Sequence, residues 1–270
     1  MENRKILIVT HEMAPYTELN EQSQFVRDLA LNLQKKGMEV RVFMPKFGTI
    51  KERKHRLHEV IRLSGLNITI GRENNPLVIK VASLQTAKIQ VYFLDNDEYF
   101  LRKNYFFDGN NKFYKDNDKR VIFFNKGVME LLIKLGWTPD VVHCQGWACS
   151  LVPIYAKSIY KIEPSVRNVK MVYSHFEDGI KQPLGDDFDV KSHLNSISTG
   201  EYEFLKKPSS EELYKAAVKN ADGVLITSQK YSKSAESYLN QTDKKLIYYK
   251  NNGADEFYEQ YIKLIKELTP

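Results

Sequence analysis

The sequence predicts an α/β fold: a doubly wound, Rossmann-like domain with a mostly parallel sheet and an antiparallel extension. Residues 5–10 form a continuous apolar run, as in a strand that is buried on both faces of a parallel sheet. A helical pattern follows from Phe25 to Leu33 and stops at Gly37, and residues 39–44 form a second strand. This βαβ unit implies a right-handed parallel crossover.

Between residues 58 and 96 the pattern changes to short apolar segments joined by polar turns. We expect these segments to form a mostly antiparallel extension of the sheet. The predicted strands are residues 60–63, 66–70, 77–81 and 89–94.

The rest of the chain returns to alternating helices and strands, which completes one doubly wound domain over residues 1–255. Residues 177–210 are polar and irregular, and we expect a surface segment there. Residues 256–270 are predicted to form a separate capping helix with its apolar residues on one face. The remaining predicted helices are 116–135, one through 151–154, 211–220 and 230–239, and the strands are 141–144, 169–174 and 223–227.

Composition narrows the functional classes. The chain has 270 residues, 42% of them hydrophobic, and no window approaches the roughly 20 apolar residues of a membrane span. The net charge of +6 is scattered among 34 acidic residues without a basic stripe, which argues against nucleic acid as a partner. The two cysteines, Cys144 and Cys149, form neither a zinc pattern nor a disulfide framework. The first residues do not resemble a signal peptide, so a cytoplasmic location is expected.

Ligands of doubly wound sheets bind at the carboxyl ends of the strands. Three of the six histidines, His11, His143 and His175, are predicted to lie at that edge. They either line a cleft together or each hold a loop as a partly buried side chain. Local metal-ligand spacing is absent, as are a Gly-x-Ser-x-Gly elbow, a dinucleotide fingerprint and a P-loop, so no metal or cofactor is expected.

Several segments resemble bacterial glycogen synthases and plant starch synthases, in the order in which that family carries them. Together they cover nearly the whole chain, from about residue 4 to residue 255. The segments are 5–15 (KILIVTHEMAP), 41–48 (RVFMPKFG), 93–100 (FLDNDEYF), 136–144 (GWTPDVVHC), 215–228, which resembles "AD-x-V-x-T-V-S", and 252–255, which resembles "NGID".

The resemblance implies the amino-terminal, acceptor-side domain of a GT-B glycosyltransferase. That family transfers glucose from a nucleotide sugar to a growing α-1,4-glucan in a cleft between two Rossmann-like domains. By resemblance, the second, nucleotide-binding domain has no counterpart in these 270 residues. His175 matches the histidine that supports the transferred sugar and is the expected catalytic residue. Tyr99 and Asn252 match positions near the acceptor and the domain junction.

The chain departs from the family pattern where synthase chemistry is concentrated. The phosphate-binding Lys-Thr-Gly-Gly-Leu appears as residues 18–22 (ELNEQ), whose carboxylates would repel a diphosphate. The "H-x-H-D-W" segment appears as residues 143–147 (HCQGW), and Phe176 replaces the asparagine after His175. The predicted substrate-binding residues are therefore His11, Glu18, Tyr99, Gln145 and Asn252.

Three functional hypotheses follow. The first is a glucan-binding or regulatory relative, a pseudoenzyme without the phosphate loop and without autonomous activity. The second is a glucosyltransferase subunit, a hexosyltransferase that extends α-1,4-glucan from a nucleotide-glucose once a partner chain supplies the missing domain. Under these two, the ligand is an α-glucan or a nucleotide sugar. The third is a cleft rebuilt for a different ligand around His11, Glu18, Gln145 and His175.

Overall fold

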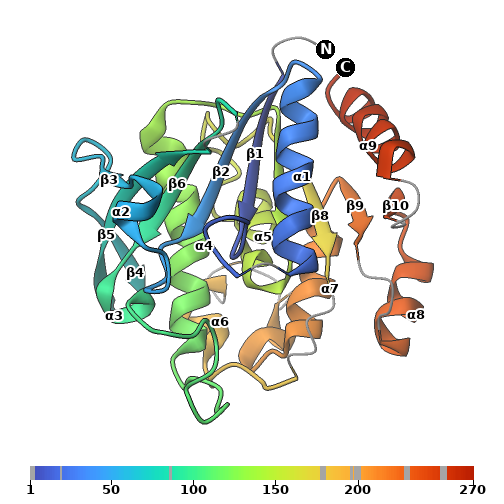
Figure 1. Ribbon diagram of the computed structural model, residues 1–270. Helices are drawn as coiled ribbons and strands as arrows, with labels where there is room; N and C mark the ends of the chain where they lie inside the picture. The colour runs from blue at the N-terminus through green and yellow to red at the C-terminus, as the bar shows by residue number, and fades with distance from the viewer. Residues whose placement is uncertain are drawn as a thin grey trace.

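The computed structural model describes residues 4–18, 20–84, 87–176, 181–194, 197, 202–227, 232–249 and 254–270. Over these ranges a ten-stranded sheet runs through the molecule in the order β10-β9-β8-β7-β1-β2-β6-β5-β3, with β4 paired to β5 (Figure 1). The strands are β1 (Lys5–Thr10), β2 (Glu39–Pro45), β3 (His58–Glu59), β4 (Leu66–Ile70), β5 (Glu73–Ser83), β6 (Gln90–Asp95), β7 (Val141–Gln145), β8 (Lys170–His175), β9 (Gly223–Ile226) and β10 (Leu246–Tyr248).

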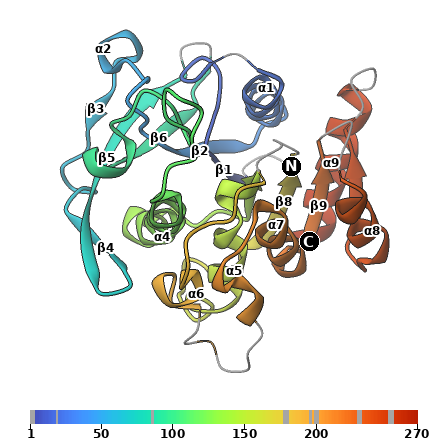
Figure 2. The same cartoon turned by 90° about the horizontal axis from the view of Figure 1, so that it is seen from below.

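Helices cover both faces of this sheet. In the view from below, α4, α5 and α7 lie on one face, and α1 lies on the other with α9 beside it (Figure 2). The helices are α1 (Glu21–Lys35), α2 (Glu52–His55), α3 (Asp97–Phe100), α4 (Asn117–Leu135), the 3₁₀ helix η1 (Trp147–Cys149), α5 (Leu151–Lys157), α6 (Phe188–Lys191), the 3₁₀ helix η3 (Glu203–Lys206), α7 (Ser210–Asn220), α8 (Lys233–Gln241) and α9 (Ala254–Leu268).

The predicted fold class is confirmed. From β10 to β6 each neighbouring pair of strands is parallel, and β3, β4 and β6 each pair antiparallel with β5. The helix predicted from Phe25 begins earlier, at Glu21, because Asn20 and Ser23 form a capping box at its amino end. Its apolar face, from Phe25 to Leu33, is buried against the sheet as predicted.

Two local predictions are wrong. The expected strand at 60–63 is a turn, in which Ile61 is 84% exposed, and strand pairing there is limited to His58–Glu59. The expected surface segment at 177–210 falls partly outside the described residues, and its described part includes Phe188 and Leu194, which are fully packed in the core.

Helix α9 packs on the same face of the sheet as α1. Phe257 packs edge-on against Phe25, with ring centroids 5.7 Å apart. Gly223 leaves room for Leu264, because a Cβ at residue 223 would lie 2.8 Å from the leucine Cδ2. The end of the chain also reaches its beginning: Arg4 donates to the carbonyl of Thr269. None of the helices over the described residues combines the length and apolarity that crossing a membrane requires.

Candidate functional site at the carboxyl edge of the sheet

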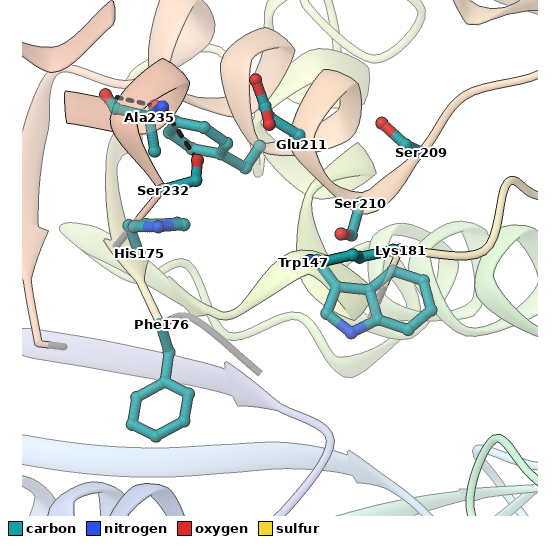
Figure 3. A pocket seen from close by; sticks show the side chains of 10 residues that line it. Trp147, His175, Phe176, Lys181, Ser209, Ser210, Glu211, Ser232 and Ala235 are labelled. Carbon is teal, nitrogen blue, oxygen red and sulfur yellow. Dashed lines mark hydrogen bonds between the residues drawn. The ribbon is translucent and has the colours of Figure 1, made fainter. Parts of the chain in front are cut away.

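A cavity of about 360 Å³ opens where β8 ends. His175 is the last residue of β8, and the amino ends of α7 and α8 face it from the side (Figure 3). Both helices begin at capping serines, Ser209 and Ser232, whose side chains accept backbone N–H groups. The lining residues are Trp147, His175, Phe176, Lys181, Ser209, Ser210, Glu211, Tyr214, Ser232 and Ala235.

His175 is held firmly in this cavity. Its carbonyl oxygen accepts hydrogen bonds from the backbone N–H of Thr227 at 3.1 Å and from the Thr227 hydroxyl at 2.8 Å. Its ring lies against Tyr214, with the centroids 4.2 Å apart. Burial lowers the pKa of His175 to about 4, and the nearby Glu211 carboxylate opposes this only in part. At neutral pH the imidazole is therefore uncharged.

The charged groups around the cavity are few. Hydrogen bonds from Lys215 and Ser234 lower the pKa of Glu211, so this residue is a carboxylate at neutral pH. Lys181 is the one cation among the described lining residues. Aromatic surface from Trp147 and Tyr214 combines here with hydroxyls, a carboxylate and a neutral imidazole. Such a lining suits a neutral, hydroxyl-rich ligand better than a diphosphate.

The ends of the two next strands, β7 and β1, extend this edge. Gly146 follows β7 with φ at +77°, and a Cβ there would lie 3.1 Å from Gln22 Nε2 and 3.5 Å from His11 Cε1. Within the described ranges, four buried polar atoms at this edge have no hydrogen-bond partner. They are His11 Nδ1, Gln22 Nε2, Gln145 Oε1 and Trp147 Nε1.

Buried polar atoms normally find partners, since each one left unpaired costs about 1–3 kcal/mol. The four atoms thus make this edge suited to a hydrogen-bonding ligand. Burial lowers the pKa of His11, with the Glu12 carboxylate opposing, so this imidazole too is neutral at pH 7. The Glu12 carboxylate, 3.6 Å from His11 Nε2, also accepts from Asn20 Nδ2 at 2.6 Å. A buried carboxylate beside the neutral His11 disfavours an anionic ligand here.

Three of the predicted site residues lie on adjacent strand ends. His175 and Gln145 end β8 and β7, and His11 follows β1. Gln145 and His175 also share a partner, because Gln145 Nε2 lies 3.5 Å from the hydroxyl of Thr227.

The other predicted site residues are placed differently. Tyr99 is buried away from the cavity, and its hydroxyl donates to Asn75 Oδ1 at 2.9 Å, so in this structure it packs the core. Glu18 is exposed; its backbone N–H donates to the hydroxyl of Tyr105, and its carbonyl accepts from the hydroxyl of Ser23. Glu12, six residues earlier in the chain, is the glutamate that is buried at this edge. Asn252 lies outside the described residues.

His143 is not at the edge of the sheet, which corrects the prediction of three histidines lining one cleft. It is the third residue of β7 and is fully buried. Its Nε2 lies 2.5 Å from the hydroxyl of Ser174, and its Nδ1 lies 3.0 Å from the hydroxyl of Tyr261 on α9. Burial lowers its pKa to about 3. His143 therefore ties α9 to the sheet.

Sequence reasoning missed Gln22, Glu211, Tyr214 and Ser232. The capping pattern Ser209-x-x-Glu212 could have placed the start of α7 at this edge, because helices in this fold begin just after the strands end. The described residues contain no group of three or more His, Cys, Asp or Glu side chains arranged to hold a metal ion.

Comparison with known proteins decides the family. The family model described as the starch synthase catalytic domain matches residues 5–244. The chain belongs to the glycogen and starch synthase family. The resemblance seen in its motifs is thereby confirmed.

Relatives in this family include two bacterial glycogen synthases. That of Chlorobaculum parvum is 34% identical over 240 residues, which are 87% of this chain and 48% of the relative. That of Chlorobium luteolum is 40% identical over 171 residues, 63% of this chain and 35% of the relative. The chain thus spans about half the length, or less, of the glycogen synthases that it matches.

The catalytic domain of starch synthase IV from Arabidopsis thaliana, in a structure bound to ADP and acarbose, superposes with a TM-score of 0.75. The superposition covers 92% of this chain and 51% of that one at 17% identity. At this identity the likeness shows the fold, and that fold is the GT-B arrangement of mixed α/β structure.

Proposed function

We propose that this synthase-family chain binds α-glucan in the cavity at His175 and does not transfer glucose by itself. The observation that carries the proposal is the chemistry of the carboxyl edge. His175 and His11 are buried and neutral there, Glu211 and Glu12 supply carboxylates, and aromatic rings flank them. Sugar hydroxyls match neutral donors and acceptors, and sugar rings stack on aromatic faces.

The same edge argues against transfer by these residues alone. A glucosyl transfer from a nucleotide sugar develops negative charge on the departing diphosphate, which cations or backbone N–H groups must stabilise. Residues 18–22 carry two glutamates where the family has a lysine and glycines. Among the described residues of the cavity, only Lys181 could approach such a charge.

A second candidate is a glucosyltransferase completed by another chain or domain. It is favoured by one observation: the chain matches about half the length of family members. In that case His175 would support the transferred glucose, and the diphosphate-binding cations would come from the completing part.

Calorimetric titration distinguishes these functions. We expect maltotetraose to bind the full chain, and ADP-glucose and UDP-glucose to bind more weakly. His175→Gln should weaken glucan binding about tenfold, which corresponds to one buried hydrogen bond of about 1.4 kcal/mol. His58→Gln, at an exposed histidine of β3, is the matched control and should leave binding unchanged.

Glu18→Gln tests the remaining prediction at that residue. Since Glu18 is exposed, the variant should bind maltotetraose as the wild type does. Preferential binding of a nucleotide sugar would overturn the glucan-binding proposal in favour of the transferase. Binding of none of the three compounds would overturn the glucan-binding proposal.

A further inference from the structure

A second cavity, of about 450 Å³, is lined by residues of β4 and α4 and of the segments that follow α5 and α6. Helix α4 packs beside both β4 and α6 (Figure 2). This second cavity shares no lining residue with the cavity at His175. Neither the family match nor the strand-edge site gives it a role. Its lining residues are Asn67, Ile68, Thr69, Lys126, Glu130, Ile159, Tyr160 and His193.

Lys126 is the central group of this cavity. It projects from the middle of α4 and is only 6% exposed. Its Nζ donates to the carbonyl of Thr69 at 2.8 Å and lies 3.0 Å from His193 Nδ1. His193 Nε2 lies 3.0 Å from the carbonyl of Gly71. A carbonyl only accepts, so the ring proton is on Nε2 and Nδ1 is the acceptor that faces the lysine.

Two acceptors are enough to satisfy both N–H donors of a neutral amine at this position. A neutral amine has two N–H donors and one lone pair, whereas an ammonium has three N–H donors and none. Two acceptors face Nζ, and Lys126 forms no ion pair with any carboxylate of the described ranges. Burial lowers the pKa of Lys126 to about 8, with Glu130 opposing weakly. About a quarter of the side chains would thus be neutral near pH 7.5.

We propose that Lys126 is a carbonyl-reactive lysine that condenses with a small hydroxylated aldehyde bound in this cavity. The amine lone pair forms a C–N bond to the aldehyde carbon, and the carbonyl electron pair moves to oxygen. One nitrogen proton passes to that oxygen, and His193 Nδ1 is placed to carry it. The hydroxyl then leaves with the second nitrogen proton as water. An amine and an aldehyde become an imine and water, and no oxidant or reductant takes part.

The remaining lining selects for hydroxyl groups on the aldehyde. Glu130, one helical turn after Lys126, accepts from the Tyr160 hydroxyl at 2.7 Å and keeps a second carboxylate oxygen for a ligand. Asn67 adds an amide, and Ile68 and Ile159 cover the carbon skeleton. Glu130 is the one carboxylate among the described lining residues and the reacting amine of Lys126 is uncharged, so the lining disfavours an anionic ligand.

Reductive trapping tests the proposal. The full chain is incubated with glycolaldehyde and cyanoborohydride near pH 7.5, and peptide mass spectrometry follows the alkylation of each lysine with time. Lys119, two turns earlier on α4, is the internal control, because its hydrogen bond to Glu73 raises its pKa. We expect Lys126 to react at least about tenfold faster than Lys119, since its neutral fraction is over a hundredfold larger.

The dependence on aldehyde concentration tests whether the cavity binds the aldehyde before it reacts. The rate at Lys126 should saturate, and the rate at Lys119 should rise linearly. Glu130→Gln should raise the concentration at half-saturation while Lys126 still reacts. A rate at Lys126 equal to or below that at Lys119 would overturn the proposal, as would an unsaturated rate at Lys126. Glucan binding is measured separately, so the two proposals fail independently.

Discussion

Acid should destabilise this fold because two histidines are buried in their neutral form. The pKa of His143 falls from 6.5 to about 3 and that of His175 from 6.5 to about 4 on folding. Below pH 6.5 the unfolded chain therefore binds more protons than the folded chain, and stability declines as pH falls. The stability that these neutral histidines contribute is fully present above the unfolded pKa of 6.5. It is lost progressively as the pH falls from 6.5 towards the folded pKa values of about 4 and about 3.

The size of the loss follows from the same values. Between about pH 7 and pH 5.5, each of these histidines costs the fold about 1.2 kcal/mol, or about 2.5 kcal/mol together. Carboxylates paired in the folded state, such as Glu52 with Lys80, lose their contribution at lower pH, because their pKa values lie below 4.5. His11, whose pKa burial also lowers, acts in the same direction as the two histidines.

Urea denaturation at the two pH values measures this loss. His143→Gln removes one of these titrating groups, so its stability should fall by about 1.2 kcal/mol less than that of the wild type over this interval. His58→Gln, at an exposed site, should lose as much as the wild type. The comparison uses the change with pH, so a lower absolute stability of His143→Gln does not affect it. An identical pH dependence in His143→Gln and wild type would refute the reasoning.

Two further predictions concern packing. Gly48→Ala should cost about 1–3 kcal/mol in urea denaturation, because its Cβ would lie 2.8 Å from the backbone oxygen of Arg102. Gly109→Ala, with open space around the added carbon, should change stability by less than about 0.5 kcal/mol, and equal effects of the two would contradict the packing argument. Tyr261→Phe should cost about 1–2 kcal/mol, since it removes the hydroxyl that contacts His143; unchanged stability would mean that α9 is held by apolar contacts alone.

The strands of the parallel region could be anticipated because each of them is a continuous apolar run. The strands of the antiparallel extension were harder to predict from the sequence, since alternating apolar residues also occur in turns. Val60 and Leu63 do pack inward from the turn that replaces the predicted strand, and the backbone N–H of Leu63 donates to the carbonyl of Val60 at 2.9 Å. Ile61, between them, is 84% exposed. That exposure depends on tertiary neighbours that sequence periodicity does not encode.

The site was predictable to the extent that it lies on strand ends. His175, Gln145 and His11 come from such ends, and topology alone brings them together. Tyr99 was predicted to lie at the site, but its short helix, α3, directs the side chain inward. There its hydroxyl donates to Asn75 on β5. The contributions of Glu211 and Ser232 depend on how α7 and α8 approach the sheet, and strand register does not determine that approach.

The hydrogen bond between Arg4 and Thr269 joins residues 265 positions apart, and it bears on how the chain folds while it is made. At about 5–20 residues per second, a ribosome takes about 10–50 seconds to synthesise that interval. Until Phe257 has been synthesised, the aromatic side chain of Phe25 on α1 lacks this neighbour, which packs against it in the fold. The nascent chain thus presents an apolar helix face that a chaperone could cover until α9 emerges.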